Sequence, residues 1–209
     1  MKSPLRRAWP LLLGLLVLAA LVPIADYLIQ LQRSEGRIPP GTERRISGRF
    51  DLVNQHGNPV SETDFADRHK LVFFGFTHCP DVCPVTLARM SVVLRLLGPA
   101  AERLYPLFIT VDPERDTPER LRQYSGPFDP RITYLTGTPQ QVTEVLDSWW
   151  VTRARVAAGA GDYSMEHSAV LYLLSPEGVV IESFRWDLTE AELARALEAR
   201  LKFECRTEV

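Results

Sequence analysis

Cysteine is scarce in this chain, with three residues among 209. A chain of this length with so few cysteines is not a small fold held together by disulfides, so any role of its thiols is local chemistry. Basic residues are not in excess either, because 24 lysines and arginines stand against 26 acidic residues, a formal net charge of -2. This balance disfavours a nucleic-acid-binding protein.

Charged residues are absent from positions 8–25, a long apolar run, and Lys2, Arg6 and Arg7 precede it. Spanning a membrane takes about 20 apolar residues, so we predict a membrane anchor over residues 1–31. Basic residues on its N-terminal side predict that the following domain is exported. The alternative is a cleaved signal peptide. The run lacks the composition of a mitochondrial transit peptide, which favours a single-pass protein of the bacterial inner membrane with its domain in the periplasm.

The remainder of the chain is predicted to form one domain. Residues 32–48 are polar, contain proline and glycine, and predict a linker. Residues 49–203 have ordinary globular composition and no internal repeat, and residues 204–209 form a tail.

Strand and helix patterns alternate along this domain. A buried strand is expected over 70–77, a helix over 84–98 and a second buried strand over 105–113. A strand near 131–137, a helix over about 138–150 opened by a capping box, a hairpin over 168–186 and a final capped helix to about 202 follow. This order predicts an α/β protein with a thioredoxin-like fold. An N-terminal β-hairpin, turning at residues 54–57, and the helix over 138–150 would be additions to it.

Two cysteines, Cys79 and Cys83, lie four positions apart where the strand over 70–77 runs into a helix. Pro84 fits the first turn of that helix, and the N-terminal N–H groups of a helix favour thiolate over thiol. The spacing is compatible with a disulfide switch, a metal clamp or two buried small residues. The position at the carboxyl edge of a sheet favours the first two.

Four histidines are available as further ligands. We predict that His56, in a turn, and His69, in a polar loop, are solvated, and that His78 points away from its neighbour Cys79. His167 follows a glycine-rich loop and precedes a buried strand. From its position it is either a hydrogen-bonded loop histidine or a metal ligand.

Three motifs resemble the Sco/SenC family of membrane-anchored copper proteins used in assembling cytochrome c oxidase. They are FGFTHCPDVCPVTL at 74–87, TVDPERDTPERL at 110–121 and EHSAVLYLLSPEG at 166–178. The resemblance covers roughly residues 45–202 and implies a thioredoxin-like domain.

The resemblance also implies a set of site residues. Copper would be held by Cys79, Cys83 and His167, and the two cysteines would form a redox-active disulfide. Asp112 would be a structural partner near the site. Glu166 stands where family members often carry aspartate, so its role beside the histidine is in doubt. Cys205 matches no family motif, and we expect it to be a free thiol of the tail.

The implied function is delivery of copper, as Cu(I) or Cu(II), to the binuclear copper site of cytochrome c oxidase subunit II. Other copper chaperones or thiol reductants would be further partners, together with the membrane. Soft thiolates select Cu(I), and imidazole suits both oxidation states. The alternative is an enzyme, a thiol–disulfide oxidoreductase that reduces the cysteines of that copper site, and the chain is primarily a metallochaperone in our interpretation. A peroxiredoxin is disfavoured because its Pro-x-x-x-Thr-x-x-Cys motif is not found at either cysteine.

Overall fold

The computed structural model describes residues 49–159, 162–167, 169–185 and 187–203. The predicted anchor, the linker, the tail and Cys205 lie outside these residues. Among the described residues, one helical stretch, Val82–Arg103, is long and apolar enough to cross a membrane. It contains the core helix of the domain, whose inner side chains are buried under the sheet, so it gives no support for a membrane span here.

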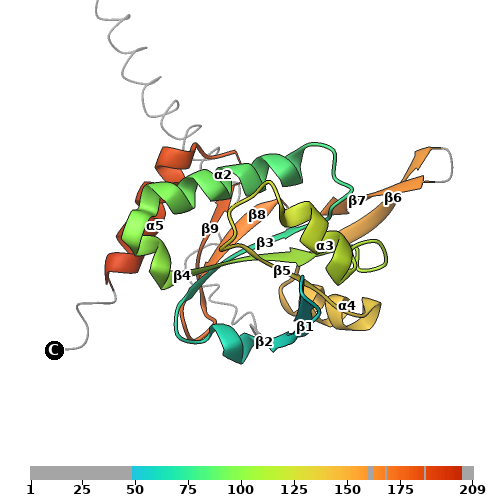
Figure 1. Ribbon diagram of the computed structural model, residues 1–209, viewed down its shortest axis with the longest axis horizontal. Helices are drawn as coiled ribbons and strands as arrows, with labels where there is room; N and C mark the ends of the chain where they lie inside the picture. The colour runs from blue at the N-terminus through green and yellow to red at the C-terminus, as the bar shows by residue number, and fades with distance from the viewer. Residues whose placement is uncertain (1–48, 160–161, 168, 186, 204–209) are drawn as a thin grey trace, which may run out of the picture. The chain divides into compact units, whose positions relative to one another are not determined.

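A seven-stranded mixed sheet forms the centre of the domain, in the order β2-β1-β5-β4-β3-β8-β9 (Figure 1). Its parallel part consists of β3 (His69–Gly75), β4 (Leu104–Thr110) and β5 (Thr133–Thr136). All seven residues of β3 are buried, as its continuous apolar run predicts. This confirms the α/β arrangement with a mainly parallel centre.

Antiparallel strands complete the sheet on both sides. On one side the predicted N-terminal hairpin is confirmed, with β1 (Asp51–Asn54) paired to β2 (Pro59–Ser61) and to β5. On the other side, β8 (Val170–Leu174) pairs with β3 and with β9 (Val180–Arg185), which confirms the predicted C-terminal hairpin.

Three helices begin where their capping signals predict, whereas the helix after the cysteine turn begins two residues before the predicted start at 84. The helices are α2 (Val82–Leu97), α3 (Pro118–Ser125), α4 (Pro139–Ser148) and α5 (Glu190–Phe203), with 3₁₀ turns η1 (Glu62–Phe65) and η2 (Gly98–Arg103). Thr117 caps α3, Thr138 and Gln141 form a capping box at α4, and Thr189 and Glu192 exchange bonds at the start of α5. Each cap satisfies N–H groups that a helix leaves open at its first turn.

The two faces of the sheet carry different helices. Phe108 on β4 packs against Tyr124 of α3, and the same face receives α2, beside which α5 lies (Figure 1). Phe74, on the other face of β3, packs with Trp149 at the end of α4 and with Tyr172 of β8. Adjacent strand residues point to opposite faces, so the apolar pairs Phe73–Phe74 and Phe108–Ile109 contribute to a core on each face of the sheet.

A second, two-stranded sheet was not predicted. It is an antiparallel hairpin of β6 (Arg153–Gly159) and β7 (Asp162–His167) that projects from one end of the domain (Figure 1). The prediction of a loop before His167 was therefore wrong, because His167 is the last residue of β7. The glycine-rich stretch that suggested a loop lies at the hairpin turn, where Gly159 has φ 89°.

Candidate metal centre

The cysteine turn connects β3 to α2. The backbone N–H of Cys79 donates to the carbonyl of Phe76 over 3.3 Å, and α2 begins at Val82 after the N-cap residue Asp81. Cys83 is therefore the second residue of the helix and is fully buried, whereas Cys79 is half-buried at the rim. Both cysteines are free thiols in this structure.

The two sulfurs have opposite acidities. The Cys83 thiol donates to the Cys79 sulfur, and the N–H groups of Cys83, at 3.4 Å, and of Asp81 also donate to it. These bonds lower the pKa of Cys79 to about 5. The same sulfur–sulfur bond and burial raise the pKa of Cys83. The site thus pairs a half-buried thiolate beside a helix N-terminus with a buried protonated thiol.

Gly75 makes room for the buried sulfur. A Cβ atom at this position would lie 3.0 Å from the Cys83 sulfur and 2.6 Å from the ring of Phe108. The strand therefore approaches the helix N-terminus so closely that no side chain fits between them.

His167 reaches the cysteines from the end of β7. Its Nε2 lies 3.8 Å from the Cys83 sulfur, and its ring meets Phe76 edge-on at a centroid distance of 5.8 Å. A second ring, that of Phe73, lies 6.4 Å away. Three residues predicted as a site, Cys79, Cys83 and His167, therefore meet with Cys83 in the middle.

Within the described ranges, no three His, Cys, Asp or Glu side chains lie close enough together to hold a metal ion as they stand. Binding one ion through both sulfurs and the imidazole therefore requires a shift of side chains. The donor set itself fits Cu(I), which accepts two thiolates and one imidazole.

The other histidines lie apart from the sulfurs. His56 is exposed, as predicted. His78 is exposed, and its Nδ1 lies 3.2 Å from Thr77 Oγ1. The prediction for His69 was wrong, because it is the first residue of β3 and only 5% exposed. The strand begins one residue earlier than the apolar run and draws this histidine into the sheet.

Asp112 lies under the β6–β7 hairpin. It is buried, its Oδ1 accepts a bond from Tyr163 Oη over 2.8 Å, and its Oδ2 accepts one from Arg115 Nε over 2.5 Å. Glu166 is exposed on β7, and its side chain leaves the strand on the face opposite to His167. The bonds to Asp112 connect it to the strand that carries the histidine.

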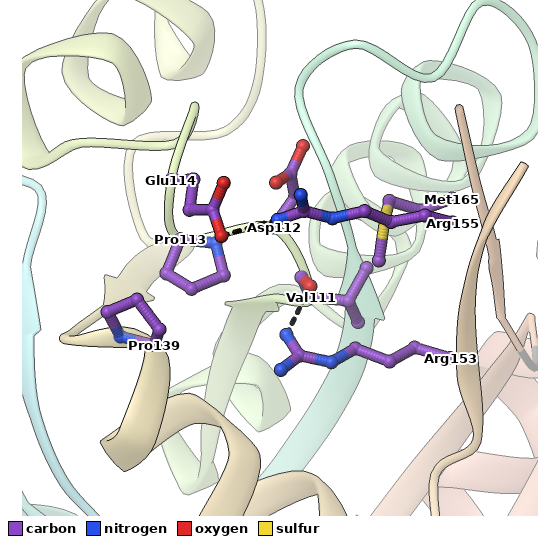
Figure 2. Close-up of a pocket in the computed structure, with 8 residues that line it drawn as sticks. All are labelled: Val111, Asp112, Pro113, Glu114, Pro139, Arg153, Arg155 and Met165. Atoms are coloured by element: carbon purple, nitrogen blue, oxygen red, sulfur yellow. Dashed lines mark hydrogen bonds and ion pairs between the residues drawn. The ribbon is translucent and has the colours of Figure 1, made fainter. Parts of the chain in front are cut away.

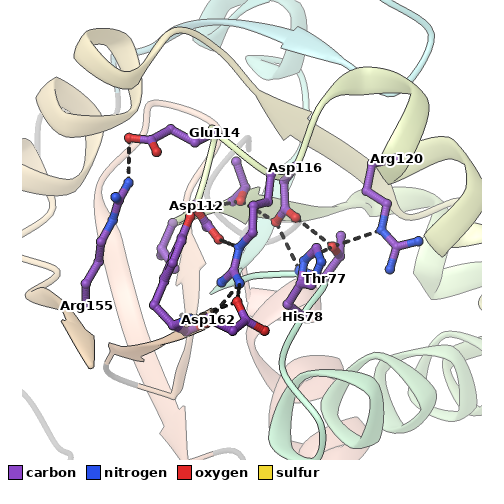
Figure 3. Close-up of polar contacts among 12 residues, drawn as sticks. Thr77, His78, Asp112, Glu114, Asp116, Arg120, Arg155 and Asp162 are labelled. Carbon is purple, nitrogen blue, oxygen red and sulfur yellow. Dashed lines mark hydrogen bonds and ion pairs between the residues drawn. The ribbon is translucent and has the colours of Figure 1, made fainter. Parts of the chain in front are cut away.

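Sequence reasoning missed Asp116, which is fully buried behind the cysteine turn (Figure 3). Its carboxylate accepts bonds from the N–H and the hydroxyl of Thr77, at 3.0 and 2.6 Å, and from the hydroxyl of Thr110, at 2.6 Å. Arg120 Nε also donates to Thr77 Oγ1, over 3.2 Å. Burial raises the pKa of Asp116. Asp116 is the third acidic residue of the DPERD motif at 112–116, but the sequence does not show which donors face it.

A small polar cavity lies under the β6–β7 hairpin, away from the sulfurs (Figure 2). Its volume is about 190 Å³. Both strands of the hairpin, the segment after β4 and the start of α4 line it, through Val111, Asp112, Pro113, Glu114, Pro139, Arg153, Arg155 and Met165. Its arginines are engaged, Arg153 with the Val111 carbonyl and Arg155 with Glu114.

Comparisons with known proteins agree with the sequence motifs. Residues 39–202 match the SCO1/SenC family. The chain is 37% identical over 157 residues to Protein sco1 of Schizosaccharomyces pombe, a match that covers 73% of this chain and 60% of that protein. The structure of Bradyrhizobium japonicum ScoI with copper bound is 39% identical, with a TM-score of 0.69, and the match covers 73% of this chain and 97% of that one.

A further neighbour is BsSco, a member of the Sco family of cytochrome c oxidase assembly proteins. A disulfide switch has been identified in that protein. It is 25% identical, with a TM-score of 0.59, and the match covers 73% of this chain and 91% of that one. These neighbours share the thioredoxin-like fold with its mixed sheet. The chain belongs to the SCO1/SenC family.

Proposed function

We propose that this chain is a membrane-anchored copper chaperone that delivers copper to the binuclear copper site of cytochrome c oxidase subunit II. The domain would face the periplasm from the bacterial inner membrane, held by residues 1–31. One observation carries the proposal: the imidazole of His167, 84 residues away in the chain, contacts the sulfur of Cys83 beside the thiolate of Cys79. Neither disulfide exchange nor packing requires an imidazole at that place.

The residues supply a simple sequence of events for copper as cargo. Cys79, already a thiolate at neutral pH, is the accessible ligand that meets the ion first. Cys83 must then lose its proton, since the thiolate is the form that binds metal. His167 closes the set from the other side of Cys83. Oxidation of the two cysteines to a disulfide, by exchange with an external disulfide that takes up the two electrons, would remove both sulfur ligands and release the cargo.

The acid–base asymmetry of the cysteines favours a second candidate function, thiol–disulfide exchange. A half-buried cysteine with a pKa of about 5 is a nucleophile at neutral pH, and the buried protonated partner is the resolving thiol. The Cys79 thiolate would attack a substrate disulfide, break its S–S bond, expel one substrate sulfur as a thiolate and form a mixed disulfide with the other. The Cys83 sulfur would then lose its proton, attack Cys79 and release the reduced substrate thiol.

His167→Ala separates the two functions because it leaves both sulfurs in place. In a copper chaperone the variant loses Cu(II)–thiolate absorption, while its disulfide still forms and reduces. Cytochrome oxidase activity in cells at limiting copper then falls. Wild-type oxidase activity in that variant, at equal protein level, would contradict the chaperone and favour the oxidoreductase.

Copper stoichiometry identifies the ligands. We expect one copper for each reduced chain, and loss of tight Cu(I) binding after Cys79→Ser, Cys83→Ser or oxidation, measured by competition with a chromogenic chelator. Cys205→Ser is the matched control and keeps wild-type binding. Loss of copper in that variant would move the site to the tail.

A further inference from the structure

The β6–β7 hairpin carries His167 but is not part of the main sheet. Among the described strands, β6 and β7 pair only with each other. At its base the hairpin continues into the main sheet, because His167 lies three residues before Val170, the first residue of β8, and Arg153, opposite His167, donates to the Val111 carbonyl over 2.7 Å. Beyond this base no backbone ladder among the described strands ties the hairpin to the sheet, so side-chain contacts with the segment after β4 fix its orientation.

One buried set of these contacts joins Asp112, Arg115 and Tyr163, which we call the latch. Tyr163 Oη and Arg115 Nε each donate to one oxygen of Asp112, which is 1% exposed. Arg115 also donates to the Tyr163 carbonyl over 2.9 Å, and its guanidinium lies 3.7 Å from the centre of the Tyr163 ring. One tyrosine is thus fixed at its hydroxyl, its ring and its backbone.

Outer contacts of the hairpin are more exposed. Arg115 pairs with Asp162 over 3.1 Å, and Arg155 pairs with Glu114 over 2.5 Å while lying over the Tyr163 ring (Figure 3). Asp162, Arg155 and Glu114 are each at least half exposed. Exposed ion pairs contribute little to stability, so the buried bonds of the latch, together with those of Arg153 at the base, hold the hairpin.

Tyr163 and His167 are on the same strand, β7, so fixing Tyr163 also limits the movement of His167. Tyr163 and His167 are four residues apart on β7, and residues at i, i+2 and i+4 of a strand lie on one face. At about 3.3 Å per residue, the two side chains leave the strand roughly 13 Å apart. We propose that Tyr163, held by Asp112 and Arg115, is the positioning residue that keeps His167 Nε2 against the Cys83 sulfur.

The role in copper binding rests on the proposed function, whereas the placement of His167 can be tested without copper. Tyr163→Phe removes only the hydroxyl that Asp112 accepts and leaves the ring under Arg115. Tyr134→Phe is the matched control, because the Tyr134 hydroxyl is buried on β5 and has no hydrogen-bond partner among the described residues. Arg115→Lys is a second latch variant, which keeps the charge but loses the fork and the ring contact.

The first measurement is amide hydrogen exchange of the full-length, reduced, copper-free chain. Tyr163→Phe and Arg115→Lys should exchange about fivefold faster across β6 and β7, with β3 and β4 unchanged, while Tyr134→Phe behaves like the wild type. Equal hairpin exchange in wild type and Tyr163→Phe overturns the proposal. Equal acceleration over the whole domain overturns it too, because that is loss of general stability.

The second measurement is the rate at which a chelator removes Cu(II) from the loaded full-length chain. Tyr163→Phe should lose copper several-fold faster and show a shifted Cu(II)–thiolate absorption, while its disulfide forms at the wild-type rate. Unchanged copper release despite faster hairpin exchange overturns the positioning role. If the wild-type chain binds no copper, the proposed function is wrong. The amide hydrogen exchange of β7 then decides by itself whether the latch positions His167.

Discussion

A Cβ atom on residue 75 would lie 3.0 Å from the sulfur of Cys83, so the last residue of β3 has to be glycine for the thiol to occupy its place. Gly75→Ala should push the sulfur or the Phe108 ring aside and destabilise the domain by about 1–3 kcal/mol. Urea unfolding measures this loss. The rate of Cys83 alkylation under native conditions should rise, since the displaced thiol is less well enclosed.

Gly126→Ala is the control for that substitution. Gly126 follows α3 with φ -52°, and a Cβ there would meet its nearest neighbour, the Gln123 carbonyl oxygen, at an ordinary 3.5 Å. We expect a change within about 0.5 kcal/mol of wild type. Equal losses at the two glycines would show that the close approach of Cys83 is not the cause.

Alkylation kinetics test the unequal acidities of the cysteines. Cys79 should react with iodoacetamide along a titration curve centred near pH 5, and Cys83 should stay unreactive at neutral pH. Cys83→Ala removes the strongest cause of the low pKa, the bond from the Cys83 thiol, so the midpoint for Cys79 should rise in that variant. A midpoint that does not move would contradict this hydrogen bond.

Stability should depend on pH through the same pair. The pKa of Cys79 is lowered on folding, so its contribution is present above the unfolded value of about 8.5 and is lost as pH falls through about 5. The pKa of Cys83 is raised, so its contribution is present below about 8.5 and is lost as pH rises above it. The difference in urea midpoint between the reduced wild type and a Cys79→Ala, Cys83→Ala variant should therefore peak near pH 8.5. A difference that is flat from pH 5 to 10 would contradict it.

Asp116→Ala should weaken the cysteine turn. It leaves three donors of Thr77 and Thr110 without their buried acceptor, and we expect a loss of about 2–4 kcal/mol in urea unfolding. Asp129→Ala is the comparison, because that carboxylate pairs chiefly with the exposed Arg131. A smaller loss of unfolding free energy in Asp116→Ala than in Asp129→Ala would show that the buried carboxylate does not stabilise the turn.

Trp150 ends α4 in a left-handed conformation, with φ 57°, and its side chain is 63% exposed. Trp150→Gly and Trp150→Ala lose the same indole, so the glycine variant should be more stable by about 1 kcal/mol, because only alanine keeps the backbone cost. At Glu144, an exposed residue inside α4, the order should reverse, with alanine the more stable by about 1 kcal/mol. Thermal unfolding of the four variants compares these pairs, and the same order at both positions would contradict the conformation of Trp150.

The main sheet and its helices could be predicted because their signals are local. The apolar run of β3 and the capping boxes at Thr138 and Thr189 are read directly from neighbouring residues. The cysteine turn followed in the same way from a strand, two cysteines and Pro84.

The β6–β7 hairpin could not be predicted because its burial pattern is weak. Most of the β6 side chains are exposed or half-buried, so no continuous apolar run marks the strand. Asp116 escaped notice for a different reason, since its role depends on donors from β3 and β4 that only the folded sheet brings together. The contact of His167 with Cys83 could not be predicted for both reasons, because His167 lies on the weakly marked hairpin and meets Cys83 only in the folded chain.

Cys83 and His167 are separated by 84 residues, whereas Cys79 and Cys83 lie within one turn. A chain that emerges from its N-terminus therefore presents both thiols long before the imidazole exists. Closing a loop of that length is unfavourable until the intervening strands have formed the sheet. Under the proposed function, a partly folded domain can bind copper only through the sulfurs of Cys79 and Cys83. Binding through His167 becomes possible only after the strands between them have folded.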